Sequence, residues 1–264
     1  MSKDPVPRRE FVKRSATALG AAGIAALPLT DALADDQAPA APPLPHRTYD
    51  GTYAGPRLNR VAFPMGGFGA GMICLEGTGA LTEVSIRNHA DVFNEPGIFA
   101  AVSVLGPTRV ARVLEGPVPG WKIFGARGAA QGSGGSLGLP RFGHASFQAR
   151  FPFGIVSLSD PAVPLAVQIT GWSPFTPGDA DSSSLPVAAL EYRFTNSARR
   201  TIKSVFSFNT RNFLPLDGND KRGVRGANGG FTIWSAAAKP EEPWRDAAVS
   251  VTVDDPGVQV NHAW

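Results

Sequence analysis

The stretch that decides the fold covers residues 63–97 and reads FPMGGFGAGMICLEGTGALTEVSIRNHADVFNEPG. Its first part is a glycine run, which allows positive φ and close chain approach and therefore predicts a sharp bend. Its second part, ALTEVSIR, alternates apolar and polar residues with a period of two, which predicts a strand. Its last part, RNHADVFNEPG, is the densest polar cluster of the chain. These parts could form a phosphate cradle, a sugar site or only the turn-rich edge of a β-domain.

The glycine run does not match a phosphate-binding loop. A dinucleotide loop needs G-x-G-x-x-G between a strand and a helix, because the helix N-terminus holds the pyrophosphate. Gly67 and Gly69 fit, but Met72 stands at the third position, and no Lys-Ser/Thr pair follows as in a P-loop. We therefore predict that Gly66, Gly67, Gly69 and Gly71 serve backbone geometry. They act either within the fold or by letting the loop press against a neighbouring domain.

Period-two alternation continues along the rest of the chain. It recurs at 145–151, 165–170, 187–194, 202–209, 230–235 and 248–253, with turns rich in Gly, Pro, Asp and Ser between these segments. The 264 residues include 30 Gly and 24 Pro and are 43% hydrophobic, which favours short strands around a sizeable core. No segment beyond the N-terminal leader has convincing helical periodicity. The sequence predicts an all-β protein, an antiparallel β-sandwich.

Residues 1–34 have the pattern of a twin-arginine signal peptide. Arg8 and Arg9 are paired, and the apolar run at 16–29 is too short to span a bilayer, which needs roughly 20 residues. The small-x-small pattern at 32–34 predicts cleavage after Ala34. The alternative is an ordinary amphipathic helix. We expect export by the Tat route to the periplasm or the exterior, and no membrane span in the mature chain.

The rest of the chain divides into a Pro/Ala-rich linker at 35–57 and a folded domain at 58–264. The Gly-rich segment 125–140 is expected to be a mobile surface loop. The net charge is +3, but the leader contributes two of these charges, and no basic cluster of the kind found in nucleic-acid-binding proteins remains. Cys74 is the single cysteine, so no intrachain disulfide is possible, and we expect a buried, inert thiol.

The polar cluster after the second strand is the candidate site. Amide, imidazole and carboxylate side chains bind sugar hydroxyls, so the cluster could form a substrate rim or a domain interface. The structural alternative is a strand-end turn held by side chain to backbone bonds. One His and two carboxylates are a weak metal signal, so we assign no metal and no cofactor. The candidates are Arg87, Asn88, His89, Asp91, Asn94 and Glu95.

No catalytic residue can be assigned from the pattern. A glycosidase needs two carboxyl groups that flank the scissile bond. Glu191 points outward on a strand, Asp179 and Asp181 lie in a turn that could cap backbone or hold Ca²⁺, and Asp217 and Asp220 lie in a Gly/Asn loop. We expect none of them to be buried beside an apolar wall, as a catalytic acid requires. There is no G-x-S-x-G either.

Three stretches resemble the N-terminal domain of glycoside hydrolase family 116, the family of bacterial β-glucosidases and non-lysosomal, bile-acid type glucosylceramidases. They are residues 63–97, then SFQARFPFGIVSLSDPAVPLAVQITGWSPFTPGDADSSSLPVAALEYRFTN at 146–196, then GVQVNHAW at 257–264. The resemblance implies a β-sandwich packed against an (α/α)6 barrel that carries the nucleophile, the acid/base and the sugar-binding residues. It also implies that the sandwich is incomplete at its C-terminal end, before the barrel.

Our leading hypothesis from this resemblance is the non-catalytic N-terminal domain of an exported β-glucosidase- or glucosylceramidase-like hydrolase, inactive alone. The glycine loop and the polar cluster would build its interface with the barrel and rim the sugar pocket, with a β-glucoside as possible ligand. The alternative is a stand-alone periplasmic carbohydrate-binding or scaffold module. Exposed aromatics could stack on sugars there, although such residues also serve core packing. They are Trp121, Trp172, Trp234 and Trp244.

Overall fold

The structure is a computed structural model that describes residues 46–92, 94–106, 109–124 and 138–261. The arginine pair Arg8–Arg9, the cleavage site after Ala34 and most of the segment 125–140 lie outside the described residues. The described residues from Arg47 onward belong to one compact unit, Arg47–Trp264, which contains all of the strands described below.

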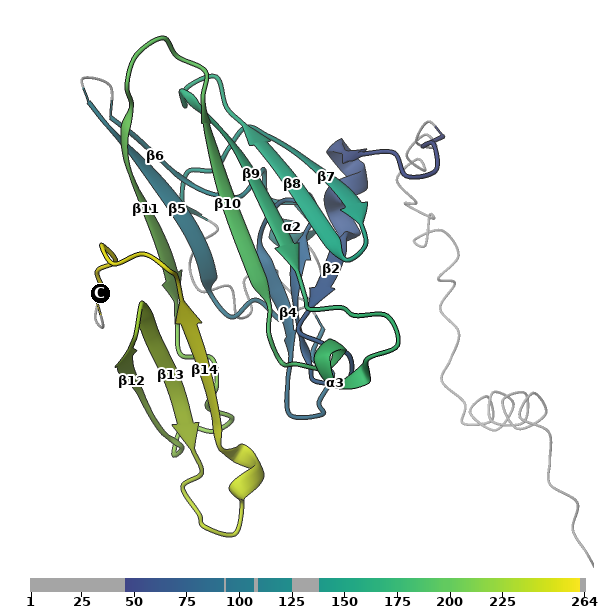
Figure 1. Cartoon of the computed structure of the whole chain (residues 1–264), viewed down its shortest axis with the longest axis vertical. Coiled ribbons are helices and arrows are strands. Elements are labelled where there is room, and N and C mark those ends of the chain that lie inside the picture. Colours follow the sequence, from purple (N-terminus) through teal and green to yellow (C-terminus); the bar gives the residue numbers. More distant parts are fainter. Residues whose placement is uncertain (1–45, 93, 107–108, 125–137, 262–264) are drawn as a thin grey trace, which may run out of the picture. The chain divides into compact units, whose positions relative to one another are not determined.

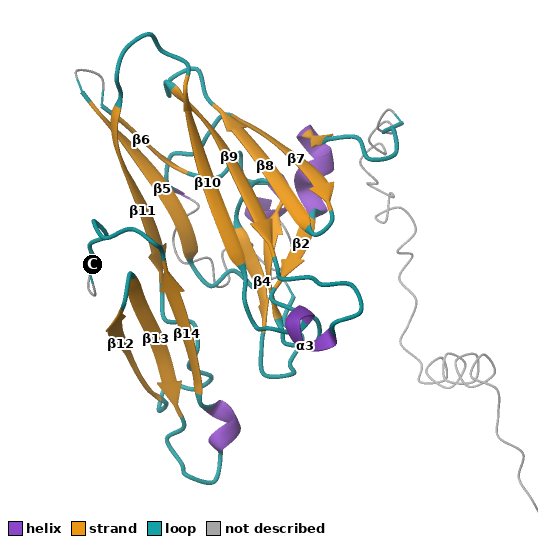
Figure 2. Ribbon diagram, viewed as in Figure 1, coloured by secondary structure: helices purple, strands orange, loops and turns teal. Residues whose placement is uncertain are grey.

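Two antiparallel sheets that face each other form the main body of this unit (Figures 1 and 2). The first sheet has the order β1-β7-β8-β9-β10, and the second has the order β11-β5-β4-β3-β2 with β6 paired to β5. This arrangement confirms the predicted all-β sandwich. The strands of the first sheet are β1 Tyr53–Ala54, β7 His144–Arg150, β8 Phe153–Ser159, β9 Leu165–Trp172 and β10 Ala189–Asn196.

The second sheet contains the decisive stretch of sequence. Its strands are β2 Ala62–Met65, β3 Met72–Glu76, β4 Leu81–Ser85, β5 Ile98–Leu105, β6 Val110–Val113 and β11 Lys203–Thr210. Four short helical segments are also described: η1 Gly55–Arg60, α2 Gly120–Phe124, α3 Ala180–Ser183 and η3 Pro243–Arg245.

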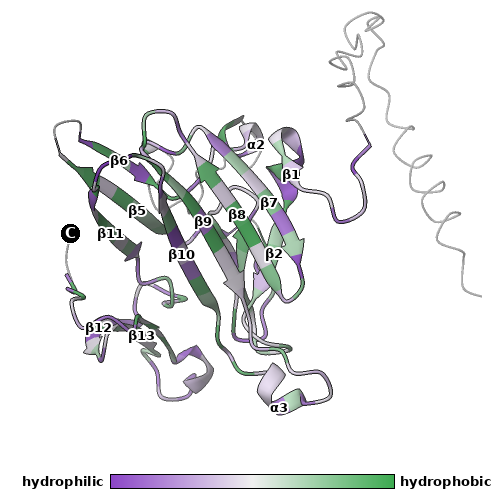
Figure 3. Cartoon of the chain, turned by 45° about the horizontal axis from the view of Figure 1, so that its top comes forward, coloured by the Kyte–Doolittle hydropathy of each residue, from purple (hydrophilic) through white to green (hydrophobic). Residues whose placement is uncertain are grey.

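The core lies between the two sheets, and period-two alternation explains why. In β9, Leu165, Val167 and Ile169 are all at most 5% exposed, while the residues between them face away from the core. Phe147 of β7 and Val156 of β8 lie beside them and are equally buried. Figure 3 shows the resulting hydrophobic stretches along β5, β8 and β9. Burial of these side chains is the main favourable term for the sandwich.

Strand β4 departs from the alternation expected for residues 80–86. The register between β3 and β4 shifts, and Glu83 has a positive φ of 54°, which is the geometry of a β-bulge. As a result Leu81 and Val84 are core residues, and Thr82 is buried through a hydrogen bond rather than through apolar packing. A bulge of this kind cannot be read from a period-two pattern.

The last strands form a separate sheet. The three strands β12 Lys221–Ala227, β13 Gly230–Ala236 and β14 Ala247–Thr252 pair in that order and do not extend either sheet of the sandwich. At the other end, β1 pairs with β7, so the sandwich begins a few residues before the expected boundary at residue 58. Within the described residues, no helix is long and apolar enough to cross a membrane.

Candidate functional site

The glycine loop between β2 and β3 packs against another part of the same chain. Gly66, Gly67, Gly69 and Gly71 all have positive φ, as the predicted bend requires. The amide of Phe68 donates to the carbonyl of Ser183 in α3 at 2.9 Å. A Cβ on Gly67 would lie 2.2 Å from the carbonyl oxygen of Leu185, so no larger residue fits without a backbone shift. The loop therefore closes on the α3 segment and not around a ligand.

This packing gathers exposed apolar side chains at one end of the sandwich. The ring of Phe68 lies 5.7 Å from that of Phe175, which lies 4.8 Å from Phe151, both in edge-to-face geometry. Phe68 and Phe151 are 59% and 66% exposed, and Leu185 and Val187 beside α3 are about half exposed. We call these five residues the aromatic end. A group of exposed apolar side chains of this kind is a candidate interaction site.

The first three residues of the polar cluster follow β4 and have two different environments. Arg87 and Asn88 have positive φ of 59° and 54°, which turns the chain sharply. The Arg87 guanidinium donates to the carbonyls of Leu214 and Arg245 at 2.8 and 3.1 Å, so it joins the end of β4 to the three-stranded sheet region. Asn88 and His89 are exposed, and their side chains have no hydrogen-bond partner among the described residues.

Asp91 and Asn94 form a strand-end turn. The Ser85 hydroxyl donates to the Asp91 carbonyl at 3.1 Å and accepts from the Asp91 amide at 3.0 Å. The Asn94 side-chain amide donates to the Val84 carbonyl at 3.2 Å and to the Asp91 carboxylate at 3.0 Å. These bonds tie the cluster back to β4, which is the local geometry expected of a turn.

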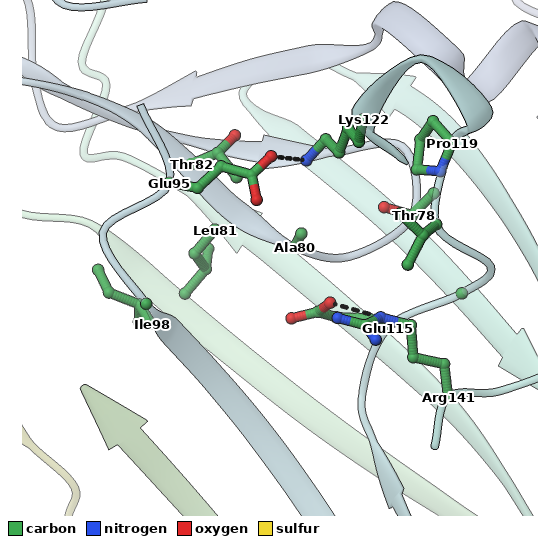
Figure 4. Close-up of a pocket in the computed structure, with 13 residues that line it drawn as sticks. Thr78, Ala80, Leu81, Thr82, Glu95, Ile98, Glu115, Pro119, Lys122 and Arg141 are labelled. Atoms are coloured by element: carbon green, nitrogen blue, oxygen red, sulfur yellow. Dashed lines mark hydrogen bonds and ion pairs between the residues drawn. The ribbon is translucent and has the colours of Figure 1, made fainter. Parts of the chain in front are cut away.

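Glu95, the last candidate, turns into the protein and contacts a buried lysine. The Lys122 ammonium lies 2.5 Å from a Glu95 oxygen (Figure 4). It also lies 2.7 Å from a Glu76 oxygen, and the Lys122 side chain is only 3% exposed. Glu76 also accepts a hydrogen bond from the Thr82 hydroxyl at 2.8 Å. We call Glu76, Thr82, Glu95 and Lys122 the Lys122 network. It links β3, β4, the β4–β5 connection and α2.

A second buried pair lies across a small cavity from this network. Glu115 and Arg141 approach to 3.1 Å, and both side chains are 7% exposed (Figure 4). The cavity between the pair and Lys122 has a volume of about 20 Å³. That is room for roughly one water molecule, and it is far too small for a sugar ring.

The pKa values of these groups follow from burial and from their partners. Burial alone lowers the pKa of Lys122, but Glu76 and Glu95 outweigh it, so the pKa is raised and the ammonium stays charged. Burial raises the pKa of Glu115 in spite of the nearby Arg141. Each buried carboxylate thus has a bound cation, and the arrangement is suited to holding strands together rather than to proton transfer.

Other residues considered in the sequence have mixed outcomes. Asp179 accepts from the Ser182 amide at 3.0 Å and caps α3, as the turn pattern indicates. Glu191 is exposed on β10 and pairs with Arg193. Asp220 is 4% exposed, but it accepts a hydrogen bond from Arg245 at 3.0 Å and from backbone amides, so its surroundings are polar rather than an apolar wall. This hydrogen bond lowers its pKa, which is opposite to what a general acid requires.

Cys74 is buried in β3, as expected for an inert thiol. Burial, with Glu83 and Glu76 nearby, raises its pKa to about 11. A thiol with this pKa is protonated at neutral pH and is a poor nucleophile.

The tryptophans have different environments. The Trp121 indole donates to the Asn59 carbonyl at 2.6 Å, and Trp234 packs over Gly223. Trp172 is half-buried with its ring 6.3 Å from Phe153, while Trp244 is 64% exposed. Trp121 and Trp234 therefore contribute to packing, whereas Trp244 is exposed and Trp172 lies on the outer face of its sheet.

The sequence pattern did not lead us to predict the Lys122 network or the Glu115–Arg141 pair. Glu76 ends the apolar strand MICLE, and Lys122 stands between Trp121 and Ile123, so each charge directly follows apolar residues. Charges in such positions are a usable signal for buried ion pairs. In the described ranges, no group of three or more His, Cys, Asp or Glu is placed to hold a metal ion.

A family model described as "beta-glucosidase 2, glycosyl-hydrolase family 116 N-term" matches residues 62–255. The match covers both sheets of the sandwich apart from β1, and all of the three-stranded sheet. The comparison with curated proteins returned no match.

Proposed function

The chain belongs to the N-terminal domain family of glycosyl-hydrolase family 116, and from that premise we propose that it is the non-catalytic part of an exported β-glucosidase- or glucosylceramidase-like hydrolase. An N-terminal domain of this family implies a catalytic partner domain in the full protein. In the proposal, that partner is an (α/α)6 barrel that supplies both carboxylates for retaining hydrolysis of a β-glucoside.

The state of the buried carboxylates supports a non-catalytic role. Glu76 and Glu95 are bound to Lys122, and Glu115 is bound to Arg141 beside a cavity that has room for one water. A retaining glycosidase instead needs a carboxylate free to attack and a second carboxyl group free to protonate the leaving group, both facing a sugar. Turnover by this domain would require these ion pairs to break.

The aromatic end is the observation that carries the assignment of a partner. Two half-exposed phenylalanines and their neighbours form an apolar surface, and Asn88 and His89 are exposed beyond the same end of β4. A Cβ on Gly71 would lie 2.7 Å from the Ser85 carbonyl, so the glycine loop and the end of β4 are in direct contact. An apolar centre with polar residues beside it is the anatomy of a protein interface. We propose that this end packs against the catalytic domain and rims its pocket.

Export is a separate part of the proposal. It is supported by the paired Arg8 and Arg9, the short apolar run and the small residues before the cut after Ala34. In a host with a Tat pathway, we expect the mature protein in the periplasm with Asp35 as its first residue. Replacing both arginines by lysine should leave the precursor in the cytoplasm. Periplasmic delivery of that double variant would contradict the Tat assignment.

The interface is tested in an intact enzyme of this family that keeps the matching residues. We expect Asn88→Ala with His89→Ala to lower either the melting temperature or the activity on an aryl β-glucoside, because both side chains would contact the barrel. Lys203→Ala, at an exposed residue at the start of β11, is the matched surface control. If the double variant keeps both the activity and the melting temperature of the parent, this interface is wrong.

A further inference from the structure

The outer face of the first sheet carries polar side chains in cross-strand rows. Strand register places Ser146 of β7, Ser157 of β8, Gln168 of β9 and Arg193 of β10 in one row. The same registers place a second row two residues further along each strand. It consists of Gln148, Ile155, Thr170 and Glu191. Small hydroxyl and amide side chains therefore cover the middle of this face.

These polar groups are available to a ligand. Within the described part of the chain, Ser146, Ser157, Gln168 and Thr195 make no side-chain hydrogen bond, although Ser146 and Gln168 are half-buried. The ion pair on these two rows is between Arg193 and Glu191, and the two charges cancel. These two rows therefore offer donors and acceptors without net charge.

The face is also hollowed. A shallow groove of about 380 Å³ runs over these strands, and its polar lining includes His144, Ser157, Gln168 and Thr195. This volume lies within the roughly 300–1,000 Å³ of typical ligand sites. The groove is hollow because small residues lie over its floor: Ser146, Ser159 and Ala166 leave space where larger side chains would fill it.

Aromatic rings lie at one end of the same face. Phe153 and Trp172 are direct cross-strand partners with ring centroids 6.3 Å apart, and Phe153 is 41% exposed. They lie three rows from His144 and Ser159, which corresponds to about 20 Å along the strands. Rings with one exposed face provide flat apolar surface, which complements the C–H face of a pyranose.

We propose that this outer face is a binding site for an extended, neutral oligosaccharide, with the hydroxyl groups of the sugar on the polar rows and one pyranose against Phe153 and Trp172. Hydroxyl and amide side chains match sugar hydroxyls as donors and acceptors. The neutral lining does not favour nucleic acid or acidic peptides, which need a basic surface. The site uses none of the five residues of the aromatic end, and the inference does not depend on where catalysis takes place.

The experiment is titration calorimetry of the purified full chain with cellopentaose, a linear neutral β-glucan fragment. We expect saturable binding of cellopentaose and much weaker binding of glucose, because a monosaccharide reaches only one row. Ser157→Phe fills the groove from an exposed position, and we expect it to abolish binding. Gln168→Ala with Ser146→Ala removes hydrogen-bonding groups, and we expect roughly tenfold weaker binding.

Two controls locate the binding. Ser207→Phe adds the same bulk at an exposed position of β11 in the other sheet and should bind like the parent. Phe151→Ser with Phe68→Ser, at the aromatic end, should do so too. Urea midpoints check that every variant is folded. The proposal is overturned if cellopentaose does not bind, if Ser157→Phe binds normally while folded, or if the aromatic-end variant alone loses binding.

Discussion

The Lys122 network and the aromatic end both depart from the usual pattern of apolar residues inside and charged residues outside. The network places charged side chains in the interior, and the aromatic end places apolar rings at the surface. In the network, a lysine that is 2% exposed lies inside the sandwich between two glutamates. At the aromatic end, phenylalanines that are more than half exposed face away from the core. Both regions adjoin the polar cluster that follows β4. Glu95, the last residue of the cluster, belongs to the network, and the glycine loop that carries Phe68 contacts the end of β4, where the cluster starts. Charges lie inside and aromatic rings outside within one part of the fold.

The difference between them lies in whether partners are present. Every charged group of the network has an opposite charge within hydrogen-bond distance, so the network is complete within this chain. The rings of the aromatic end pack edge to face against one another, and a large part of their surface remains exposed. A charged side chain can be buried at low cost only when it is paired with an opposite charge. An exposed aromatic ring contributes to stability only when another surface covers it. The network is therefore complete within the domain, and the exposed rings support the proposed interface.

The largest expected effect comes from breaking the network. Lys122→Met leaves the carboxylates of Glu76 and Glu95 buried without their cation, so we expect the free energy of unfolding to fall by about 3–5 kcal/mol. Urea denaturation followed by circular dichroism measures this value. Lys203→Met removes the same charge from an exposed position on β11 and should change stability by less than about 0.5 kcal/mol. Equal effects of the two substitutions would show that the buried pairing contributes nothing.

The second effect tests the contact that builds the aromatic end. Gly67→Ala and Gly69→Ala both place a Cβ at positive φ, which costs roughly 1–2 kcal/mol. The added methyl group of Gly67→Ala would meet backbone, whereas that of Gly69→Ala would point into open space with no contact within 4 Å. We therefore expect Gly67→Ala to lose about 1–3 kcal/mol more stability than Gly69→Ala. The same urea titration compares them, and equal losses would mean that the loop does not depend on its contact with Leu185.

A smaller effect is expected at the exposed rings themselves. Phe68→Ser with Phe151→Ser removes two edge contacts at the surface, so the unfolding free energy of the chain alone should fall by about 1 kcal/mol or less. Binding of an apolar dye by the folded chain should decrease at the same time, because exposed apolar surface is lost. A loss of several kcal/mol would place these rings in the core rather than in an interface.

The smallest effect concerns an outer ion pair and appears only above acid pH. The Ala162 amide, at 2.8 Å, and Arg112 lower the pKa of Asp160. A lowered carboxyl pKa stabilises the fold above the unfolded value of about 3.9, and this stabilisation is lost as the pH falls below it. Asp160→Asn should therefore cost a few tenths of a kcal/mol at pH 7 and nothing near pH 2. Urea midpoints across this range measure the difference, and a cost that persists at pH 2 would rule out titration of Asp160 as its origin.

Much of the fold was predictable because burial follows the period of the strands. β9 alternates without interruption, and its core residues are those that the pattern places on one face. The bulge at Glu83 was not predictable, because a single inserted residue changes the facing of its neighbours without changing composition. The separation of β12 to β14 from the sandwich was also missed, since sheet partnership depends on contacts between distant segments.

The polar composition of residues 87–95 located the candidate site, but it did not predict which of these residues are exposed and which are paired inside the protein. The sequence grouped His89 with Glu95, whereas the structure leaves the first at the surface and pairs the second with Lys122. Its cation lies 27 positions away in the sequence, so no local pattern reveals the pair. The ion pair of Asp220 was not predicted for the same reason, because Arg245 meets it only through the folding of the third sheet.

Reading the coding DNA downstream of the Trp264 codon tests the central claim, a domain that works with a catalytic partner, most directly. We predict that the reading frame continues, directly or after one frameshift, into a helical barrel with paired carboxylates. A clean stop codon with no barrel encoded nearby would contradict the proposed partner and leave the sugar-binding groove as the function to test.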